Sequence, residues 1–214
     1  MMPPNDPTHS ASEPHAHHAA TVRLSLSEIN ALCFKAARGA GLTWGEAEEA
    51  GWAAAWLSRA GLVGPSLILA WLSEAATLVR PAPAPGHWAA QARPHCPLRT
   101  GAALADFAGL PEGPGEEPLT IADLAHPLIT LPFVARAAGR VDLVLRMRWG
   151  KTDVALDASG PLPGVDIPTG YHRAAVDLTI TPCAEKARAG TTRQDSAPVG
   201  AVAFDHWQAL DALA

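Results

Sequence analysis

Two capping boxes, close together in the sequence, constrain the fold of this chain more than any other feature. They are Ser25-x-x-Glu28 and Thr43-x-x-Glu46. In each box the hydroxyl accepts a hydrogen bond from the start of a helix, and the glutamate reaches back to the backbone of the capping residue. Glycines follow both segments, where a left-handed C-terminal residue is most easily accommodated: Gly39, Gly41 and Gly61. The pattern predicts a helical hairpin and a folded region that starts near Val22.

Each predicted helix carries a face for packing. In the first, the apolar stripe has helical spacing and consists of Ile29, Leu32, Cys33, Ala36 and Ala37. In the second, the contact face consists of Trp44, Ala47, Gly51, Ala54 and Ala55, with Trp52 and Trp56 beside it. A third helix is predicted from Pro65 to about Val79, because proline is favoured in a first helical turn. Prolines then forbid further helix at Pro81, Pro83 and Pro85.

The second half of the sequence is typical of strands. Apolar residues alternate from Val141 to Trp149, and Gly150-Lys151 suits a type II′ hairpin because glycine takes the first central position. The resulting register pairs Met147 with Val154, Leu145 with Leu156, and Arg148 with Asp153.

Four further segments complete the prediction. A strand over 172–180 ends at Pro182 and carries His172 on its apolar face. Residues 128–138 are compatible with either a strand or a short helix, and residues 185–197 are predicted to form an exposed loop. Asp205 is predicted to cap a final helix.

Helices followed by mostly antiparallel strands favour an α+β fold. We expect a helical hairpin and a third helix packed on a mainly antiparallel sheet, with a C-terminal helix. Residues 1–21 are predicted to be a disordered tail, and 22–214 a single domain. That domain would comprise a helical half (22–80), a proline-rich connector (81–97) and a β-rich half (98–214). The tail contains histidines that are capable of weak metal binding: His9, His15, His17 and His18.

Charge and cysteine content restrict the partners and the compartment. A formal net charge of −5 argues against a nucleic-acid partner, which usually needs a basic surface. The three cysteines are odd in number and far apart, so they predict no disulfide framework and favour a reducing cytoplasm. The longest apolar run, about 60–72, is too short for a bilayer, and the N-terminus lacks a signal-peptide pattern. We therefore expect a cytoplasmic protein without a membrane partner.

Cys96 and His172 are the candidate catalytic residues. Cys96 follows His95 between two prolines, and adjacent residues of an extended segment point in opposite directions. A general base for Cys96 would therefore come from elsewhere, such as His126 or His172. The alternative is that none of these residues is catalytic. Cys96 would then be a small buried hydrophobic side chain, and His126 and His172 would be hydrogen-bonded histidines of the core. No metal is assigned, because the histidines and cysteines lack the spacing of zinc ligands: His95, Cys96, His126, His172 and Cys183.

Arg146 and Arg148 lie on one face of the predicted strand, where they could hold a carboxylate or a phosphate. His95 and His126 are the other candidate ligand-binding residues. The alternative for the arginines is a solvated face neutralised by acidic neighbours: Asp142, Asp153 and Asp157. The sequence contains no phosphate-binding loop, dinucleotide fingerprint or nucleophile elbow, so the cofactor and any enzymatic reaction stay open.

Three stretches together resemble a bacterial family, domain of unknown function 3726. The first is Leu24-Ser-Leu-Ser-Glu-Ile-Asn-Ala-Leu-Cys33 with its continuation Lys35-Ala-Ala-Arg-Gly-Ala-Gly41. The others are Cys96-Pro-Leu-Arg-Thr-Gly-Ala-Ala-Leu-Ala-Asp106 and His126-Pro-Leu-Ile-Thr-Leu-Pro-Phe133. The resemblance would cover most of the chain after residue 22. It implies a bacterial cytoplasmic protein without a known activity, and a further C-terminal segment beyond the position of Ala214.

A weaker resemblance, over about 24–72, is to the non-Rossmann malate/L-lactate dehydrogenase family. That family carries its catalytic histidine in a Ser-His-Gly motif, whereas this sequence has Gly64-Pro65-Ser66. We therefore expect a protein that binds, and could act on, a small anionic metabolite between the helical half and the sheet. The alternative is an accessory subunit or homo-oligomer that docks through small residues beside Trp52 or Trp56: Ala50, Ala53 and Ala54.

Overall fold

Both predicted capping boxes are formed, and they begin the first two helices, α1 (Leu26–Gly39) and α2 (Trp44–Arg59). The computed structural model describes residues 21–162, 175–186 and 199–214. The Ser25 hydroxyl accepts from the Glu28 amide at 3.3 Å, and the Ser25 amide donates to the Glu28 carboxylate at 2.7 Å. Gly41 and Gly61 follow the helices with φ of +87° and +83°, which confirms the predicted left-handed ends.

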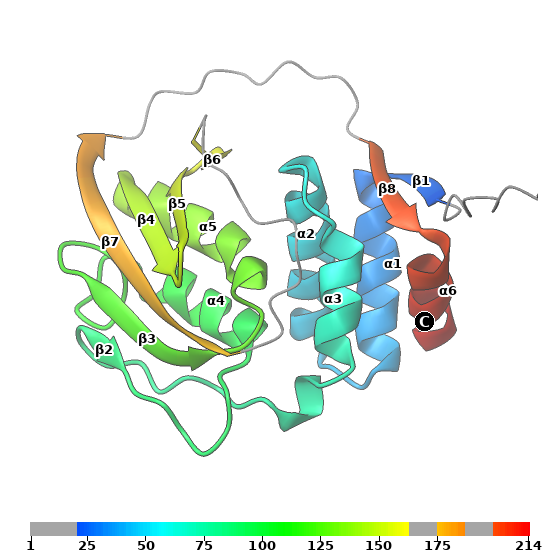
Figure 1. The fold of residues 1–214 in the computed structure, drawn as a ribbon, viewed down its shortest axis with the longest axis horizontal. Helices are drawn as coiled ribbons and strands as arrows, with labels where there is room; N and C mark the ends of the chain where they lie inside the picture. Colours follow the sequence, from blue (N-terminus) through cyan, green and yellow to red (C-terminus); the bar gives the residue numbers. More distant parts are fainter. Residues whose placement is uncertain (1–20, 163–174, 187–198) are drawn as a thin grey trace, which may run out of the picture.

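The helical part of the molecule contains two further helices and a small sheet. Helix α3 (Gly64–Leu72) packs on α2, and α6 (Phe204–Leu213) packs on α1 and α3. Strand β1 (Thr21–Ser25) pairs with β8 (Val199–Ala203), so the last described strand lies beside the first (Figure 1). The last strand and helix therefore lie with the helical part and not with the large sheet.

The large sheet has six strands in the order β2-β3-β7-β4-β5-β6. These are β2 (His87–Trp88), β3 (Leu119–Leu124), β4 (Leu143–Trp149), β5 (Thr152–Asp157), β6 (Gly160–Pro161) and β7 (Val176–Lys186). Every neighbouring pair is antiparallel except β2 and β3, which are parallel. The architecture confirms the predicted α+β class.

The β4–β5 hairpin has the predicted register. Met147 is opposite Val154, Leu145 opposite Leu156, and Arg148 opposite Asp153. Gly150 has φ +52° and Lys151 does not have positive φ, as a type II′ turn requires.

Strand β7 continues past Pro182 to Lys186, so the predicted end at Pro182 is wrong. Its pairing with β3 stops at Ile180, so Pro182 has a neighbouring strand only in β4. A proline is tolerated there because one side of the strand has become an edge. The predicted loop loses its first residues to β7, and the rest of it lies outside the described residues.

Two helices, α4 (Pro97–Asp106) and α5 (Leu131–Val141), lie between the sheet and the helical part (Figure 1). Residues 128–138, for which the sequence was compatible with either a strand or a short helix, are helical. The 3₁₀ turn η2 (Pro127–Thr130) leads into α5. Phe133 on α5 and Leu145 and Met147 on β4 are fully buried in the core. Gly101 of α4 has no Cβ, which lets α4 approach the Phe133 ring; an added Cβ would lie 2.4 Å from it.

Three local predictions are wrong. The third helix ends at Leu72, because the chain turns at Ser73, whose hydroxyl donates to the Ala70 carbonyl, before the 3₁₀ turn η1 (Ala75–Thr77). Trp44 does not join the contact face of α2: it starts that helix and is 62% exposed, edge-on to Phe34. Asp205 lies in the first turn of α6, but Ala203 is the capping residue.

Candidate functional site

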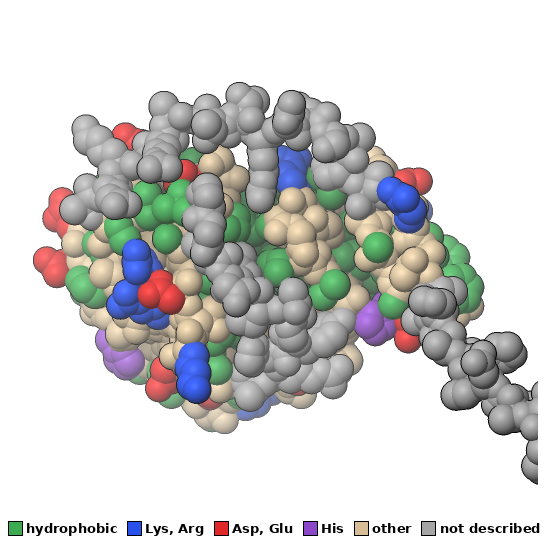
Figure 2. Space-filling view, turned by 45° about the horizontal axis from the view of Figure 1, so that its top comes forward, with side chains coloured by type: hydrophobic (Ala, Val, Ile, Leu, Met, Phe, Trp, Pro, Cys, Tyr) green, Lys and Arg blue, Asp and Glu red, His purple; other side chains and the backbone are tan. Residues whose placement is uncertain are grey.

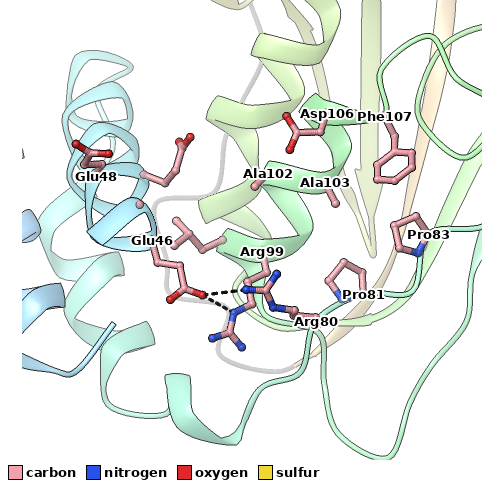
Figure 3. A pocket seen from close by; sticks show the side chains of 13 residues that line it. Glu46, Glu48, Arg80, Pro81, Pro83, Arg99, Ala102, Ala103, Asp106 and Phe107 are labelled. Atoms are coloured by element: carbon pink, nitrogen blue, oxygen red, sulfur yellow. Dashed lines mark hydrogen bonds and ion pairs between the residues drawn. The ribbon is translucent and has the colours of Figure 1, made fainter. Parts of the chain in front are cut away.

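A cavity of about 530 Å³ lies between the start of α2, helix α4 and the segment 80–83 (Figure 3). Its floor is made of small and apolar side chains from α4, with Leu98, Ala102 and Ala103. Prolines and the Phe107 ring form one wall. Its volume is within the usual range for small-molecule sites. The cavity separates the helical part from the helices that cover the sheet.

Two arginines share one carboxylate oxygen at one end of the cavity (Figure 3). Arg99 Nε donates to Glu46 Oε1 at 2.8 Å, and Arg80 Nη2 lies 3.7 Å from the same oxygen. The Glu46 side chain is 14% exposed, whereas Arg80 is 73% exposed. Two guanidinium groups against one carboxylate leave a surplus positive charge at this end.

The local sequence explains why Glu46 presents only one oxygen to the arginines. Glu46 is the glutamate of the second capping box, and its Oε2 accepts from the Thr43 amide and hydroxyl at 3.1 and 2.8 Å. Oε1 then faces Arg99, which lies in the first turn of α4. The capping box therefore both starts α2 and orients the carboxylate of the site.

Burial of Glu46 by itself raises the pKa of this carboxyl. The hydrogen bonds from Arg99 and Thr43, together with the positive charge of Arg99, outweigh burial and hold its pKa below the usual value. Glu46 is therefore ionised at neutral pH and fixes both arginines.

The remaining carboxylates of the cavity lie away from the arginine pair. Glu49 is neutralised by Arg136 of α5, with bonds of 2.9 and 3.1 Å. Arg136 also lies 3.7 Å from the centre of the Trp52 ring, which joins α2 to α5. Asp106 lies 3.4 Å from Arg140, and Glu48 accepts from the Trp44 indole at 2.9 Å. Within the described parts of the chain, Glu48 forms no ion pair.

The structure does not place Cys96 at this cavity. Cys96 is 2% exposed and caps α4 through its backbone. Burial raises the pKa of the Cys96 thiol, although the amides of Arg99 and Leu98 oppose this effect. The side chain is therefore a neutral thiol, in keeping with the alternative of a small buried hydrophobe.

The candidate histidines His95 and His126 do not line this cavity either, although the His95 carbonyl accepts from the Ala125 amide, directly before His126. His95 is fully buried in bridges to Val79 and Leu124, and burial lowers its pKa although the nearby Asp123 opposes this. His126 is 2% exposed, has φ +45°, and its Nε2 contacts the Glu74 carboxylate. His172 lies outside the described residues.

Arg146 and Arg148 lie on the face of β4 that alternates with the buried Leu145 and Met147. Both pair with Asp153, at 3.4 and 2.9 Å, and their side chains are 40% and 53% exposed. In the view of Figure 2, basic and acidic side chains lie near one another on the visible described surface. The two arginines thus form an exposed patch that the single carboxylate of Asp153 neutralises only in part.

The described residues contain no group of three histidine, cysteine, aspartate or glutamate side chains suited to a metal ion. Over the same ranges, no helix combines the length and the apolarity needed to cross a membrane. The sequence analysis missed Arg80, Arg99 and Glu46 as site residues. The available signal was that Glu46 belongs to a capping box and that arginines lie on both sides of the proline-rich connector.

Comparison with known proteins supports the family resemblance over part of the chain. Residues 24–110 match the family described as "Protein of unknown function (DUF3726)", which confirms the resemblance predicted from the sequence over this segment. No curated protein and no solved structure matches the chain. The comparisons do not show the second resemblance, to malate/L-lactate dehydrogenases. All residues that line the cavity lie within the matched segment.

Proposed function

We propose that this protein binds a small anionic metabolite in the cavity between α2 and α4, and that Arg80 and Arg99 hold its acidic group. The observation that carries this proposal is the convergence of two guanidinium groups on one carboxylate oxygen at the end of a cavity. Arg99 uses its Nε for Glu46, and its two terminal nitrogens have no partner among the described residues, so they can donate to a carboxylate or phosphate. This site replaces Arg146 and Arg148 as the anion-binding residues.

The surroundings of the arginine pair favour a small organic ligand over a simple ion. The apolar floor and the Phe107 ring offer surface on which a hydrocarbon body would be buried. The proposal concerns binding, because the candidate nucleophile Cys96 is buried outside the cavity.

The test is a thermal-shift screen with organic carboxylates and inorganic phosphate. A ligand present at a hundredfold excess over its Kd should raise Tm by about 5–10 °C in a domain of this size. Arg80→Gln should reduce the shift, because it removes one of the two guanidinium groups, and it should leave the fold intact, because Arg80 is mostly exposed and forms only a long ion pair. Arg148→Gln is the matched control and should retain it. A shift lost in Arg148→Gln but kept in Arg80→Gln would contradict the proposal, as would no shift in the whole panel.

The accessory-subunit alternative finds less support, because the small residues of its predicted docking surface are buried within this chain. Ala50, Ala53 and Ala54 are fully buried within this chain. Trp52 packs edge-on to Phe133, with ring centroids 5.2 Å apart. The three alanines therefore serve the packing of α2 within its own fold, and only the half-buried Trp52 and Trp56 remain accessible for the docking proposed in this alternative.

A further inference from the structure

We infer that the ligand of this cavity is a monoacid, with its acidic group at Arg80 and Arg99 and a hydrocarbon body along α4, and that Asp106 disfavours ligands with a second acidic group. This inference rests on the proposed function and names the class of ligand. It follows from the order of side chains along α4, the hydrogen-bond donors of the lining and the ion pairs that are already formed.

One face of α4 carries a cation, a small apolar floor and a carboxylate, in that order. The lining residues of this face have the spacing i, i+3, i+4 and i+7, which places them in one row: Arg99, Ala102, Ala103 and Asp106. Figure 3 shows the two alanines between Arg99 and Asp106. The rise of the helix from Arg99 to Asp106 is about 10 Å. A ligand held at Arg99 and lying along α4 therefore meets the alanines first and Asp106 last.

The arginine pair supplies the only side-chain hydrogen-bond donors among the described residues that line the cavity. The other polar side chains of this lining are all carboxylates: Glu46, Glu48, Glu49 and Asp106. An ionised carboxylate accepts hydrogen bonds and cannot donate them. An acidic group placed away from the arginines would therefore lose part of its hydration without gaining a donor, which opposes binding.

The charges of the lining also suit a single acidic group. Glu46 compensates one of the two guanidinium charges, so one positive charge remains at this end. At the other end, Arg140 is not among the described lining residues, and its guanidinium contacts the Ala105 carbonyl and Asp106. A second acidic group would meet the carboxylate of Asp106 there, and like charges repel. Water screens part of this repulsion, because the Asp106 side chain is 72% exposed.

The surface between the two ends suits a body without polar atoms. Ala102 and Ala103 present only methyl groups, and the rings of Phe107, Pro81 and Pro83 lie beside them (Figure 3). A hydrocarbon chain is removed from water there, which favours binding in proportion to the apolar area buried. A monoacid thus places its only polar group at the arginine pair and its hydrocarbon body over this surface.

The experiment compares hexanoate, hexanedioate and hexan-1-ol by isothermal titration into the full chain. The three probes have the same carbon chain and differ only in their end groups. We expect hexanoate to bind at least about tenfold more tightly than hexanedioate, which corresponds to about 1.4 kcal/mol. If the second acid had no effect, hexanedioate would bind at least as tightly, because either of its ends could lie at the arginine pair. Hexan-1-ol lacks the acid and should bind more weakly than hexanoate.

Two variants test the role of Asp106. Asp106→Lys places a cation and a donor at an exposed position, so it should reduce the preference for hexanoate over hexanedioate by at least about threefold. The fold should be retained, because the ion pair that is lost, with Arg140, is itself exposed. Glu117→Lys makes the same change of charge at an exposed position outside the described lining and should leave the preference unchanged.

The outcomes separate the two proposals. If hexanedioate binds the wild-type protein as tightly as hexanoate does, the monoacid inference is wrong while anion binding stands. Equal changes of the preference in Asp106→Lys and Glu117→Lys would contradict the role of Asp106. If neither acid binds, or if hexan-1-ol binds as tightly as hexanoate, the proposed function itself fails, and the inference fails with it.

Discussion

In the part of the chain that the structure describes, two pairs of arginines each share one carboxylate, and the surroundings of the two pairs differ. Arg80 and Arg99 meet Glu46 at the end of a cavity, whereas Arg146 and Arg148 meet Asp153 on an open strand face. The shortest contacts are similar, at 2.8 and 2.9 Å. The Glu46 side chain is 14% exposed, and the Asp153 side chain is 42% exposed.

This difference shows that surroundings, and not the charge count, distinguish a candidate binding site from a solvated patch. Water and salt screen the exposed pair, so its ion pairs contribute little. The cavity pair lies beside apolar surface, and Glu46 is held by the capping box of α2. A ligand acid would therefore meet the oriented Arg99 beside apolar surface at Glu46, and a half-exposed strand face at Asp153.

The largest expected contrast concerns two thiols, one near each arginine pair. Cys183 is half-buried beside Arg146, whereas Cys96 is 2% exposed, three residues before Arg99. We expect a thiol reagent such as Ellman's reagent to modify Cys96 at least about a hundredfold more slowly than Cys183, because Cys96 must first be exposed by opening of the fold.

Cys33 is an internal reference in this experiment. It is fully buried, and burial raises its pKa to about 12, so it should react only on unfolding. Mass spectrometry of the modified cysteines identifies each site. Rapid modification of Cys96 in the native protein would restore it as a candidate nucleophile and would contradict this account.

The next contrast is in stability. Arg99→Met removes a charge-assisted hydrogen bond from a mostly buried carboxylate and should lower the free energy of unfolding by about 1–2 kcal/mol. Arg148→Met should lower it by less than about 0.5 kcal/mol, because the pair is exposed and Arg146 still contacts Asp153. Urea denaturation measures both values. Equal losses would show that the two pairs are energetically alike.

The pH dependence of stability should contain a contribution from Glu46 and its arginine partners, beside that of Glu28, whose pKa the hydrogen bonds from Ser25 also lower. The pKa of Glu46 is lower in the folded protein than in the unfolded chain, where it is about 4.3. The charge of Glu46 therefore stabilises the fold fully above the unfolded pKa. This stabilisation is lost as the pH falls through the pKa of the folded state. Glu46→Gln keeps the capping geometry. It should lower stability on the order of 1 kcal/mol at pH 7, and this difference should shrink below about pH 4.

The measurement is urea denaturation of the wild-type protein and Glu46→Gln between pH 7 and the lowest pH at which both fold reversibly. Glu28→Gln, in the other capping box, is the matched control without an arginine partner within the described residues. A difference between wild type and Glu46→Gln that stays constant with pH would show that the Glu46 charge does not contribute.

The smallest effect is expected at the exposed pair. Asp153→Asn should change the free energy of unfolding by no more than about 0.5 kcal/mol at low salt, and by less at 1 M NaCl, because solvent screens these charges. Thermal denaturation at both salt concentrations measures this effect. A loss above 1 kcal/mol that persists in high salt would mean that the patch is a structural element.

The sequence was most informative where the structure depends on neighbouring residues. The capping boxes of Ser25 and Thr43 and the register around Gly150 were predicted correctly, because each depends on hydrogen bonds or pairing within a few residues. The pairing of β1 with β8 was not predicted, since its partners come from opposite ends of the chain. The continuation of β7 past Pro182 was also not predicted. It depends on the end of the pairing with β3, which leaves one edge of β7 without a neighbouring strand at Pro182.

The candidate site was missed for the same reason. Arg148 and Asp153 are opposite each other in one hairpin, so the sequence pointed to them, whereas Arg99 and Glu46 are 53 positions apart and meet through the packing of α4 near α2. For Cys96 the sequence left a nucleophile and a buried hydrophobe as alternatives, because it does not display the burial that raises the pKa of this thiol.

The most direct test of the central claim is to locate an acid on the protein by NMR. Hexanoate is titrated into ¹⁵N-labelled protein, and the shifted backbone amides are mapped. The account predicts saturable shifts at the cavity residues Gly45, Glu46, Ala102 and Ala103, and none at 146–153. Shifts centred on Arg146 and Arg148, with the cavity amides unchanged, would contradict it.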